Sequence, residues 1–200
     1  LLDANGRAVA QKNLTANAQG TAAVQLNIAN AKAWSPEQPY LYTLEVSLYQ
    51  GNKLADRLRQ RVGIRTVAVS KEHGFQLNGQ SRKFKGVCLH HDLGPLGAAV
   101  NKAALIRQIR LMKEMGADAI RTSHNMPSQM QMDVCDSMGM MVMAESFDAW
   151  KEPKVKNGYN RFYDEWWRKD LENLIRGHRN HPSIVMWSIG NEIPEQWNKE

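Results

Sequence analysis

Short apolar strands and helices alternate along residues 84–187, and this alternation constrains the fold more than any other feature of the chain. The apolar segments that indicate strands are residues 84–89, 119–120, 140–143 and 184–187. Between them, apolar residues recur every three or four positions, which is the spacing of a helix face. The order is therefore β-α-β-α-β-α-β. Strands that are joined by helices in this way pair in parallel and are buried on both faces.

The predicted helices carry clear start and stop signals. Asn101 is a typical N-cap for the first helix, and Gly116 and Gly139 lie where a left-handed residue closes the first and second helices. Pro182 terminates the third helix. The residues with helical spacing are Leu105, Ile106, Ile109 and Met112, then Val134, Cys135 and Met138, then Trp167, Leu171, Leu174, Ile175 and His178.

Polar residues follow each of the four predicted strands. They are His90, His91 and Asp92 after the first, Arg121 and His124 after the second, Glu145 after the third, and Asn191 and Glu192 after the fourth. The carboxyl ends of the strands form the active-site face of a (β/α)₈ barrel. A doubly wound sheet binds ligands only near a switch point, and no glycine-rich nucleotide loop follows the first strand. We therefore predict an α/β unit over residues 70–200 that forms the first half of a (β/α)₈ TIM barrel.

Residues 1–69 have a different sequence pattern, with short segments of alternating apolar and polar residues and many turn signals. Residues 40–49 alternate apolar and polar side chains as a half-buried strand does, and residues 50–52 supply a turn. Asn5 and Gly6 predict a hairpin, and residues 74–79 predict another. Several such strands indicate that residues 1–69 form a partial β-sandwich domain ahead of the barrel.

Composition and charge exclude several classes of protein. The 200 residues are 42% hydrophobic and 23% charged, as in an ordinary globular chain. No apolar run is long enough for a membrane span, and no segment resembles a targeting signal. The net charge of +6 is spread along the chain, so neither nucleic acid nor a membrane is predicted as a partner. Cys88 and Cys135 lie in apolar runs and indicate buried thiols, which leaves the compartment, periplasmic or cytoplasmic, undetermined.

Each polar cluster also has a purely structural interpretation. A histidine at a strand end is often a satisfied core residue, and Arg121 and Glu145 would make a structural ion pair. Glu192 would then be a solvated loop carboxylate. The methionines between residues 126 and 143 indicate core filling in place of a metal or binding groove.

Two long motifs resemble the signatures of glycoside hydrolase family 2. Residues 119–127, Ala-Ile-Arg-Thr-Ser-His-Asn-Met-Pro, resemble its barrel signature, which continues in Cys-Asp-Ser-Met-Gly at 135–139. Residues 179–192, Arg-Asn-His-Pro-Ser-Ile-Val-Met-Trp-Ser-Ile-Gly-Asn-Glu, resemble its acid/base signature. Segments at 34–42 and 62–65 look like the immunoglobulin-like sandwich that precedes the barrel in this family, and residues 85–92 look like its first barrel strand.

The resemblance implies a retaining glycoside hydrolase that acts on terminal β-glycosides or β-linked oligosaccharides, without a cofactor. It makes Glu192 the catalytic general acid/base and Asn191 the residue that hydrogen-bonds the sugar 2-hydroxyl. The family context is also compatible with a homo-oligomer. The residues that it implies for substrate binding are His90, Asp92, Arg121, His124, Glu145 and Asn191.

Two motifs are closest to β-galactosidases within the family. They are residues 88–92, Cys-Leu-His-His-Asp, and residues 188–196, Ser-Ile-Gly-Asn-Glu-Ile-Pro-Glu-Gln. β-Glucuronidases more often carry Ala at the position of Gly190; β-glucuronidase and β-mannosidase are the alternatives. Large bacterial β-galactosidases hold magnesium with a Glu and a His soon after the third strand, where this chain reads Glu-Ser-Phe-Asp-Ala-Trp, so no metal site of that kind is predicted.

Retention of configuration requires two carboxyl groups about 5–5.5 Å apart, one that protonates the leaving oxygen and one that attacks the anomeric carbon. The resemblance places the attacking glutamate after the seventh barrel strand, outside these residues. Four strands cannot close a barrel, so we expect a fragment of a longer enzyme that is inactive alone. Glu192 must also keep its proton near neutral pH, which burial and the partner carboxylate would favour.

Two other classes of function use the same residues. A metal-dependent hydrolase barrel would employ His90, His91, Asp92, His124 and Glu145, although the chain lacks the His-x-His pair that many such barrels have on the first strand. A catalytically inactive carbohydrate-binding protein is the second class. Trp150 and Trp197 follow strand ends and fit either a stacking platform for a sugar ring or ordinary loop packing.

Overall fold

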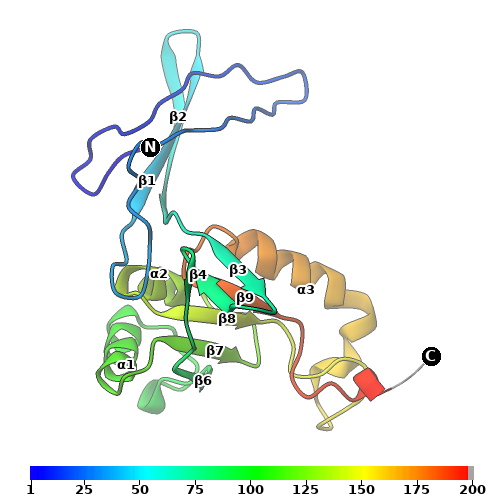
Figure 1. Cartoon of the computed structure of the whole chain (residues 1–200). Helices are drawn as coiled ribbons and strands as arrows, with labels where there is room; N and C mark the ends of the chain where they lie inside the picture. The colour runs from blue at the N-terminus through cyan, green and yellow to red at the C-terminus, as the bar shows by residue number, and fades with distance from the viewer. Residues whose placement is uncertain (198–200) are drawn as a thin grey trace.

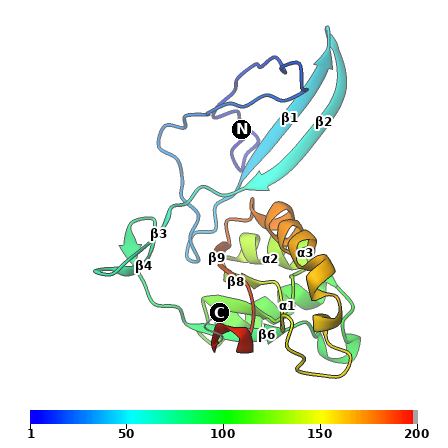
Figure 2. The same cartoon turned by 90° about the vertical axis from the view of Figure 1, so that its right-hand side faces the viewer.

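The computed structural model describes residues 1–197, whose named strands form three separate sheets (Figure 1). Two antiparallel strands, β1 and β2, form a ribbon that extends away from the parallel sheet and lies beside the amino-terminal segment (Figure 2). Three short strands, β3 to β5, form a second sheet, and β6 to β9 form the third. Within residues 1–197, no helix has the length and apolar character that a membrane crossing needs.

The largest sheet consists of four parallel strands that pair in sequence order, β6-β7-β8-β9. Its strands are β6 (Gly86–His90), β7 (Ala119–Ser123), β8 (Met141–Glu145) and β9 (Ile184–Ser188). The connecting helices are α1 (Lys102–Glu114), α2 (Gln129–Met138) and α3 (Tyr163–His178). The predicted β-α-β-α-β-α-β order is confirmed, and all four carboxyl ends lie along one edge of the sheet.

The helix ends agree with the signals in the sequence. The side chain of Asn101 accepts a hydrogen bond from the backbone N–H of Ala104 at 3.0 Å, which caps α1. Ser128 caps α2 in the same way through the N–H of Gln131, at 3.2 Å. Gly139 ends α2 in the left-handed region, with φ of +70°. A residue with a Cβ adopts that conformation only at a cost, which is why glycine is favoured there.

One apolar core fills the space between the parallel sheet and its helices. It contains Ile120, Val142, Ala144 and Ile184 from the strands, with Val87 and Leu89 packed against it. The helices contribute Leu105, Ile109, Met132, Val134, Cys135 and Leu174. Met132 and Met140 are buried here as predicted, whereas Met126 and Met130 are exposed. Cys88 is also exposed, because it lies on the opposite face of β6 from Val87 and Leu89, so its prediction as a buried thiol was wrong.

The first 69 residues contain fewer strands than the sequence suggested. β1 (Tyr42–Gln50) and β2 (Lys53–Val62) confirm the predicted strand and its turn, and the Asn-Gly turn is closed by a single bridge between Leu2 and Ala8. Residues 9–32 contain no strand. Residues 1–66 therefore contribute a two-stranded ribbon and extended segments to the partial sandwich that we predicted. Alternation and turn signals identify strands but not whether a second sheet lies opposite them.

A small sheet follows this ribbon in the chain and packs against the parallel strands. It consists of β3 (Val67–Ser70), β4 (Gly74–Leu77) and β5 (Gln80–Ser81), with the predicted hairpin turn at Asn78 and Gly79. β3 runs across the domain boundary that we predicted after residue 69. A second core, which includes Leu77, Ala119, Met141 and the fully buried Trp34, joins this sheet to the amino-terminal ends of the parallel strands.

Residues 34–36 and 65 connect the amino-terminal segment to the parallel sheet and its helices. The indole N–H of Trp34 donates to the carbonyl of Asp136 at 2.8 Å, and the Arg65 Nε donates to the carbonyl of Pro182 at 2.6 Å. A Cβ added to Gly139 would lie 2.4 Å from the Pro36 carbonyl oxygen. The glycine that closes α2 therefore also allows a close backbone contact between the two parts of the chain.

We expect Gly139→Ala to destabilise the protein more than Gly116→Ala. Both glycines have positive φ, but a Cβ at Gly116 meets nothing within 4 Å. The control substitution should cost about 1–2 kcal/mol from backbone strain. Gly139→Ala should cost at least about 2 kcal/mol more, because the Pro36 backbone has to move. The urea midpoints of the two whole-length variants measure the difference. Equal midpoints would contradict the expected cost of moving the Pro36 backbone.

Candidate active site

Glu145, the last residue of β8, lies at the centre of the polar residues along the carboxyl edge of the sheet. Its side chain is 0% exposed. Arg121 Nε donates to Glu145 Oε2 at 2.8 Å, and the Ser188 hydroxyl donates to the same oxygen at 2.5 Å. His124 Nδ1 lies 2.6 Å from Glu145 Oε1. Both carboxylate oxygens are therefore occupied by groups from β7, from the loop after it and from β9.

Glu145 differs from our expectation of a substrate contact. We placed it with the sugar-binding residues because it follows a strand, but its two oxygens face other side chains and none of its surface is exposed. The alternative interpretation, an ion pair between Arg121 and Glu145, is confirmed by their separation of 2.7 Å. A buried carboxylate with these partners orients the residues around it.

Arg121 connects this buried carboxylate to the loop that carries the candidate acid/base. Its Nη2 donates to Asn191 Oδ1 at 2.8 Å, while Glu145 holds the other side of the guanidinium. Burial lowers the pKa of Arg121, but the hydrogen bond and charge of Glu145 outweigh it and keep the pKa above the ordinary value. Arg121 thus remains a fixed cation between β8 and the loop after β9.

Asn191 and Glu192 follow β9 in a turn. Asn191 is buried and its Nδ2 lies 3.5 Å from Glu192 Oε2, so the amide and the carboxyl are neighbours. Glu192 has a φ of +45°, in the left-handed region that costs a non-glycine residue about 1–3 kcal/mol. Its side chain is 82% exposed, so the burial that we expected around Glu192 is not provided by residues 1–197. The spacing of the motif identified Glu192 as a candidate, but it carried no information on how far the Glu192 side chain is buried.

His90 and His124 lie at the carboxyl ends of β6 and β7, on the same edge of the sheet as Glu145. Their rings meet edge to face with centroids 5.2 Å apart, which brings the ends of β6 and β7 together. His91 and Asp92 make contacts within the loop after β6: His91 Nε2 lies 3.0 Å from the carbonyl of Ala98, and Asp92 accepts the N–H of Gly94 at 2.5 Å. Arg121, His124, Glu145 and Asn191 therefore form one hydrogen-bonded group, whereas the contacts of His91 and Asp92 stay within their own loop.

Sequence reasoning missed four residues of this group. The Ser188 hydroxyl donates to Glu145 Oε2, and the Thr122 hydroxyl oxygen accepts the backbone N–H of Glu145 at 3.0 Å. Asp148 accepts Asn191 Nδ2 at 3.1 Å, and Lys154 Nζ lies 3.2 Å from the same Asp148 oxygen. Asp148 lies three residues after the end of β8, so its position after a strand could have identified it as a site residue. Lys154 lies in an irregular loop, where no periodic signal could have identified it.

The two tryptophans beyond the strand ends differ in their surroundings. The indole N–H of Trp150 donates to the Ile189 carbonyl at 2.8 Å, and its ring stacks on Tyr163 with centroids 6.1 Å apart. Trp150 therefore packs the loop after β8 against β9 and α3. Trp197, at the end of η3 (Pro194–Trp197), is 80% exposed.

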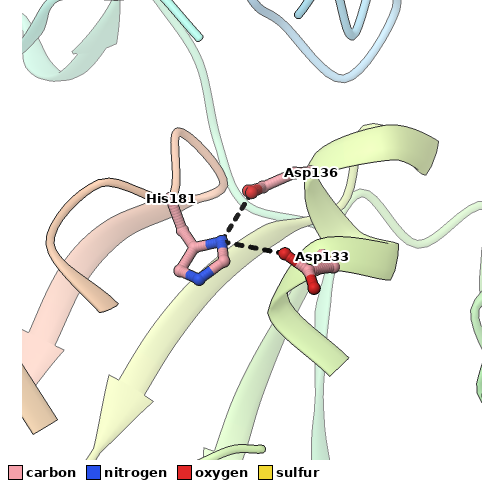
Figure 3. A group of neighbouring side chains, drawn as sticks. All are labelled: Asp133, Asp136 and His181. Atoms are coloured by element: carbon pink, nitrogen blue, oxygen red, sulfur yellow. Dashed lines mark hydrogen bonds and ion pairs between the residues drawn. The ribbon is translucent and has the colours of Figure 1, made fainter. Parts of the chain in front are cut away.

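A separate polar group, on α2 and the segment before β9, has the spacing of metal ligands. Among residues 1–197 it consists of Asp133, Asp136 and His181, whose ligand atoms lie within 4.8 Å of one another (Figure 3). His181 Nδ1 lies 2.6 Å from Asp136 Oδ2, and His181 Nε2 lies 2.6 Å from Gln129 Nε2. Because both ring nitrogens are occupied, we interpret the group as a structural clamp. It includes none of the residues of the metal-hydrolase alternative.

Comparison with known proteins gives consistent matches along the chain. Residues 67–199 match the family model described as glycosyl hydrolases family 2, TIM barrel domain, and residues 1–65 match the model described as glycosyl hydrolases family 2. The beta-galactosidase BoGH2A of Bacteroides ovatus is 45% identical over 99% of this chain and 24% of its own length. A putative beta-glucuronidase of Formosa agariphila is 43% identical over 96% of this chain and 18% of its own length.

A solved structure agrees with these matches. It is a member of glycosyl hydrolase family 2 from Bacteroides cellulosilyticus, with a TM-score of 0.92 and 41% identity over 98% of this chain and 26% of that chain. The chain thus spans about a quarter or less of the length of these relatives.

We expect Glu145→Gln to destabilise the barrel sheet by about 2–3 kcal/mol, because it leaves the partly buried Arg121 cation without its counter-charge. Glu172→Gln is the matched control. Glu172 pairs with Arg168 and Arg176 on the surface of α3 with its side chain 44% exposed, so its loss should cost less than about 1 kcal/mol. Urea unfolding of the whole-length variants compares the two, and a Glu145→Gln effect no larger than the control would contradict the central role of this carboxylate.

Proposed function

The chain belongs to glycosyl hydrolase family 2, and on that premise we propose that it supplies the acid/base side of the active site of a retaining β-glycosidase. The observation that carries the proposal is the position of Glu192. It lies in the turn after β9 at the carboxyl edge of the parallel sheet, beside Asn191, whose amide oxygen accepts a hydrogen bond from Arg121 at 2.8 Å. The residue that the family 2 motif implies as the acid/base is therefore also a carboxyl beside the hydrogen-bonded group at the strand ends.

In this proposal Glu192 protonates the glycosidic oxygen as the bond to the anomeric carbon breaks, and then removes a proton from the water that releases the sugar. Its exposed side chain is free to reach a substrate. Arg121 occupies Asn191 Oδ1, so the group of Asn191 that would meet the sugar 2-hydroxyl is its NH₂, one hydrogen of which is donated to Asp148 Oδ1. His90, His124, Arg121 and Asp92 line the subsite for the non-reducing sugar, and Glu145 acts only by orienting Arg121 and His124.

The nucleophilic carboxyl is proposed to lie outside residues 1–197, in agreement with the resemblance. Asp148 is a carboxylate near Glu192, but its Oδ1 accepts both Asn191 Nδ2 and Lys154 Nζ. Burial would raise the pKa of Asp148, yet these two hydrogen bonds and the Lys154 charge lower it below the ordinary value. We therefore assign Asp148 to positioning.

We propose a β-galactoside as the substrate. The relative named beta-galactosidase is 45% identical over 99% of this chain, and the wording of residues 88–92 and 188–196 points the same way. β-Glucuronidase is the second candidate, favoured by the relative that is 43% identical and named a putative beta-glucuronidase.

We also propose the two-part organisation of the chain. Residues 1–69 belong to an immunoglobulin-like sandwich, of which β1 and β2 are two strands, and residues 70–200 to the first half of a TIM barrel. Support comes from the boundary between the two matched family models, at residues 65 and 67, and from the parallel order of β6 to β9.

Removal of the acid/base carboxyl gives a direct test in the whole protein. Glu192→Ala should slow hydrolysis of alkyl β-glycosides by at least about a hundredfold, since an alkoxide leaves poorly without a proton. Aryl β-glycosides with good leaving groups should be affected much less, and azide should partly restore their turnover. Glu172→Ala is the control that should leave this leaving-group dependence unchanged, because Glu172 pairs with Arg168 and Arg176 on the surface of α3. Equal losses on alkyl and aryl substrates would remove Glu192 from the role.

A panel of nitrophenyl glycosides tests the choice of sugar. We expect kcat/KM of the whole protein to be highest for the β-galactoside among the galactoside, glucuronide, mannoside and glucoside, by at least about tenfold, which is roughly 1.4 kcal/mol of transition-state binding. A preference for the glucuronide would transfer the assignment to β-glucuronidase without affecting the role of Glu192.

A further inference from the structure

Lys154 contacts the candidate acid/base from a loop that the family motifs do not cover. The loop, residues 146–158, connects β8 to η2 (Tyr159–Arg161). Lys154 Nζ donates to the Asn191 carbonyl at 2.7 Å and to Asp148 Oδ1 at 3.2 Å, and it lies 3.6 Å from Glu192 Oε2. A flexible lysine side chain is thus held by three acceptors, two of them in the Asn191-Glu192 turn.

The loop that carries Lys154 is fastened to the segment after Glu192. Glu195 Oε1 accepts the backbone N–H groups of Lys151 and Glu152 at 2.7 and 2.9 Å. Trp150 fixes the same loop to β9 through the Ile189 carbonyl at 2.8 Å. Lys154 therefore keeps its place relative to the turn, and only 22% of its side chain is exposed.

The contacts on Asn191 come from three directions. Arg121 holds its amide oxygen, Asp148 accepts from its amide nitrogen, and Lys154 binds its backbone carbonyl. Because Glu192 follows in a left-handed conformation, the orientation of its carboxyl depends on how firmly the preceding residue is held. Lys154 supplies the contact on the main chain of the turn.

Lys154 also places a positive charge 3.6 Å from Glu192 Oε2. An ammonium group near a carboxyl favours the carboxylate form, which suits the base step and opposes the acid step. The other charged groups around this turn are Arg121 and His124 at the end of β7, Asp148 on the same loop as Lys154, and Glu195 on η3. Asp148 shares the Lys154 ammonium and so weakens its effect on Glu192.

We propose that Lys154 is a positioning residue and counter-ion of Glu192, and that the Asp148–Lys154 pair sets the pH range in which Glu192 can donate a proton. This role rests on the proposed acid/base function of Glu192. After proton donation, the Lys154 ammonium stabilises the carboxylate of Glu192. Before donation, the negative charge of Asp148 limits how strongly the Lys154 ammonium disfavours the protonated form of Glu192.

Variants of the whole protein test this through the alkaline limb of the kcat/KM profile, which reports the essential acid of the free enzyme. An alkyl β-glycoside is the substrate, because its poor leaving group requires that acid. Lys154→Met should move the limb to higher pH, since the cation that favours the carboxylate is gone. Asp148→Asn should move it to lower pH, because the whole ammonium charge then acts on Glu192.

Lys154→Arg, which keeps the charge, should leave the limb within about 0.3 units of the unmodified protein. Lys151→Met is the matched control: Lys151 lies in the same loop, but it pairs with Asp164 at 2.8 Å on the surface, so its loss should not move the limb. Shifts of Lys154→Met and Asp148→Asn in the same direction, or an unmoved limb in both, would overturn the proposal. The near-isosteric Asp148→Asn gives this answer even if Lys154→Met fails to fold.

Azide rescue of Glu192→Ala separates this proposal from the proposed function. If azide restores turnover but the limb does not respond to Lys154 or Asp148, only the counter-ion role is wrong. If azide has no effect and alkyl and aryl substrates lose activity equally, the acid/base assignment itself fails.

Discussion

The arrangement at the carboxyl edge of the barrel strands depends on one buried charge, the carboxylate of Glu145. Its two oxygens bind Arg121, His124 and Ser188, so the ends of β7, β8 and β9 are held together by one group. A carboxylate without exposure is stable only when paired and hydrogen-bonded, and Arg121 meets that requirement. Because Arg121 extends from Glu145 to Asn191, the same ion pair also determines the position of the turn that bears Glu192.

The opposite end of the sheet is held by backbone contacts and apolar packing. Trp34 is fully buried there and donates to the Asp136 carbonyl, while His181 clamps α2 to the segment before β9 through Asp136. Gly139 allows the Pro36 backbone to approach the end of α2. The amino-terminal part of the chain is thereby coupled to the helices without contributing to the polar edge, so the two ends of the strands divide stability and chemistry between them.

The polar edge combines rigid and accessible groups. Glu145, Asn191 and Thr122 are buried, whereas Glu192 extends outward with 82% of its side chain exposed. An acid/base group has to reach a substrate and keep a fixed direction, and the contacts on Asn191 provide direction without covering the carboxyl. Asp148 and Lys154 add a balanced pair of charges beside it, which connects the loop after β8 to the proton chemistry proposed for Glu192.

The sequence by itself determined the order of strands and helices, the caps at Asn101 and Gly139, and the residues at each strand end. These are local properties, set by hydrophobic period and backbone conformation. It did not determine that Glu145 is buried, that Asp148 and Lys154 meet at Asn191, or that residues 9–32 form no strand. Those features arise from contacts between segments that are distant in sequence, and such contacts leave no periodic signal. Only the tertiary structure, by bringing the ends of four strands together, decided which polar residues orient others and which face outward.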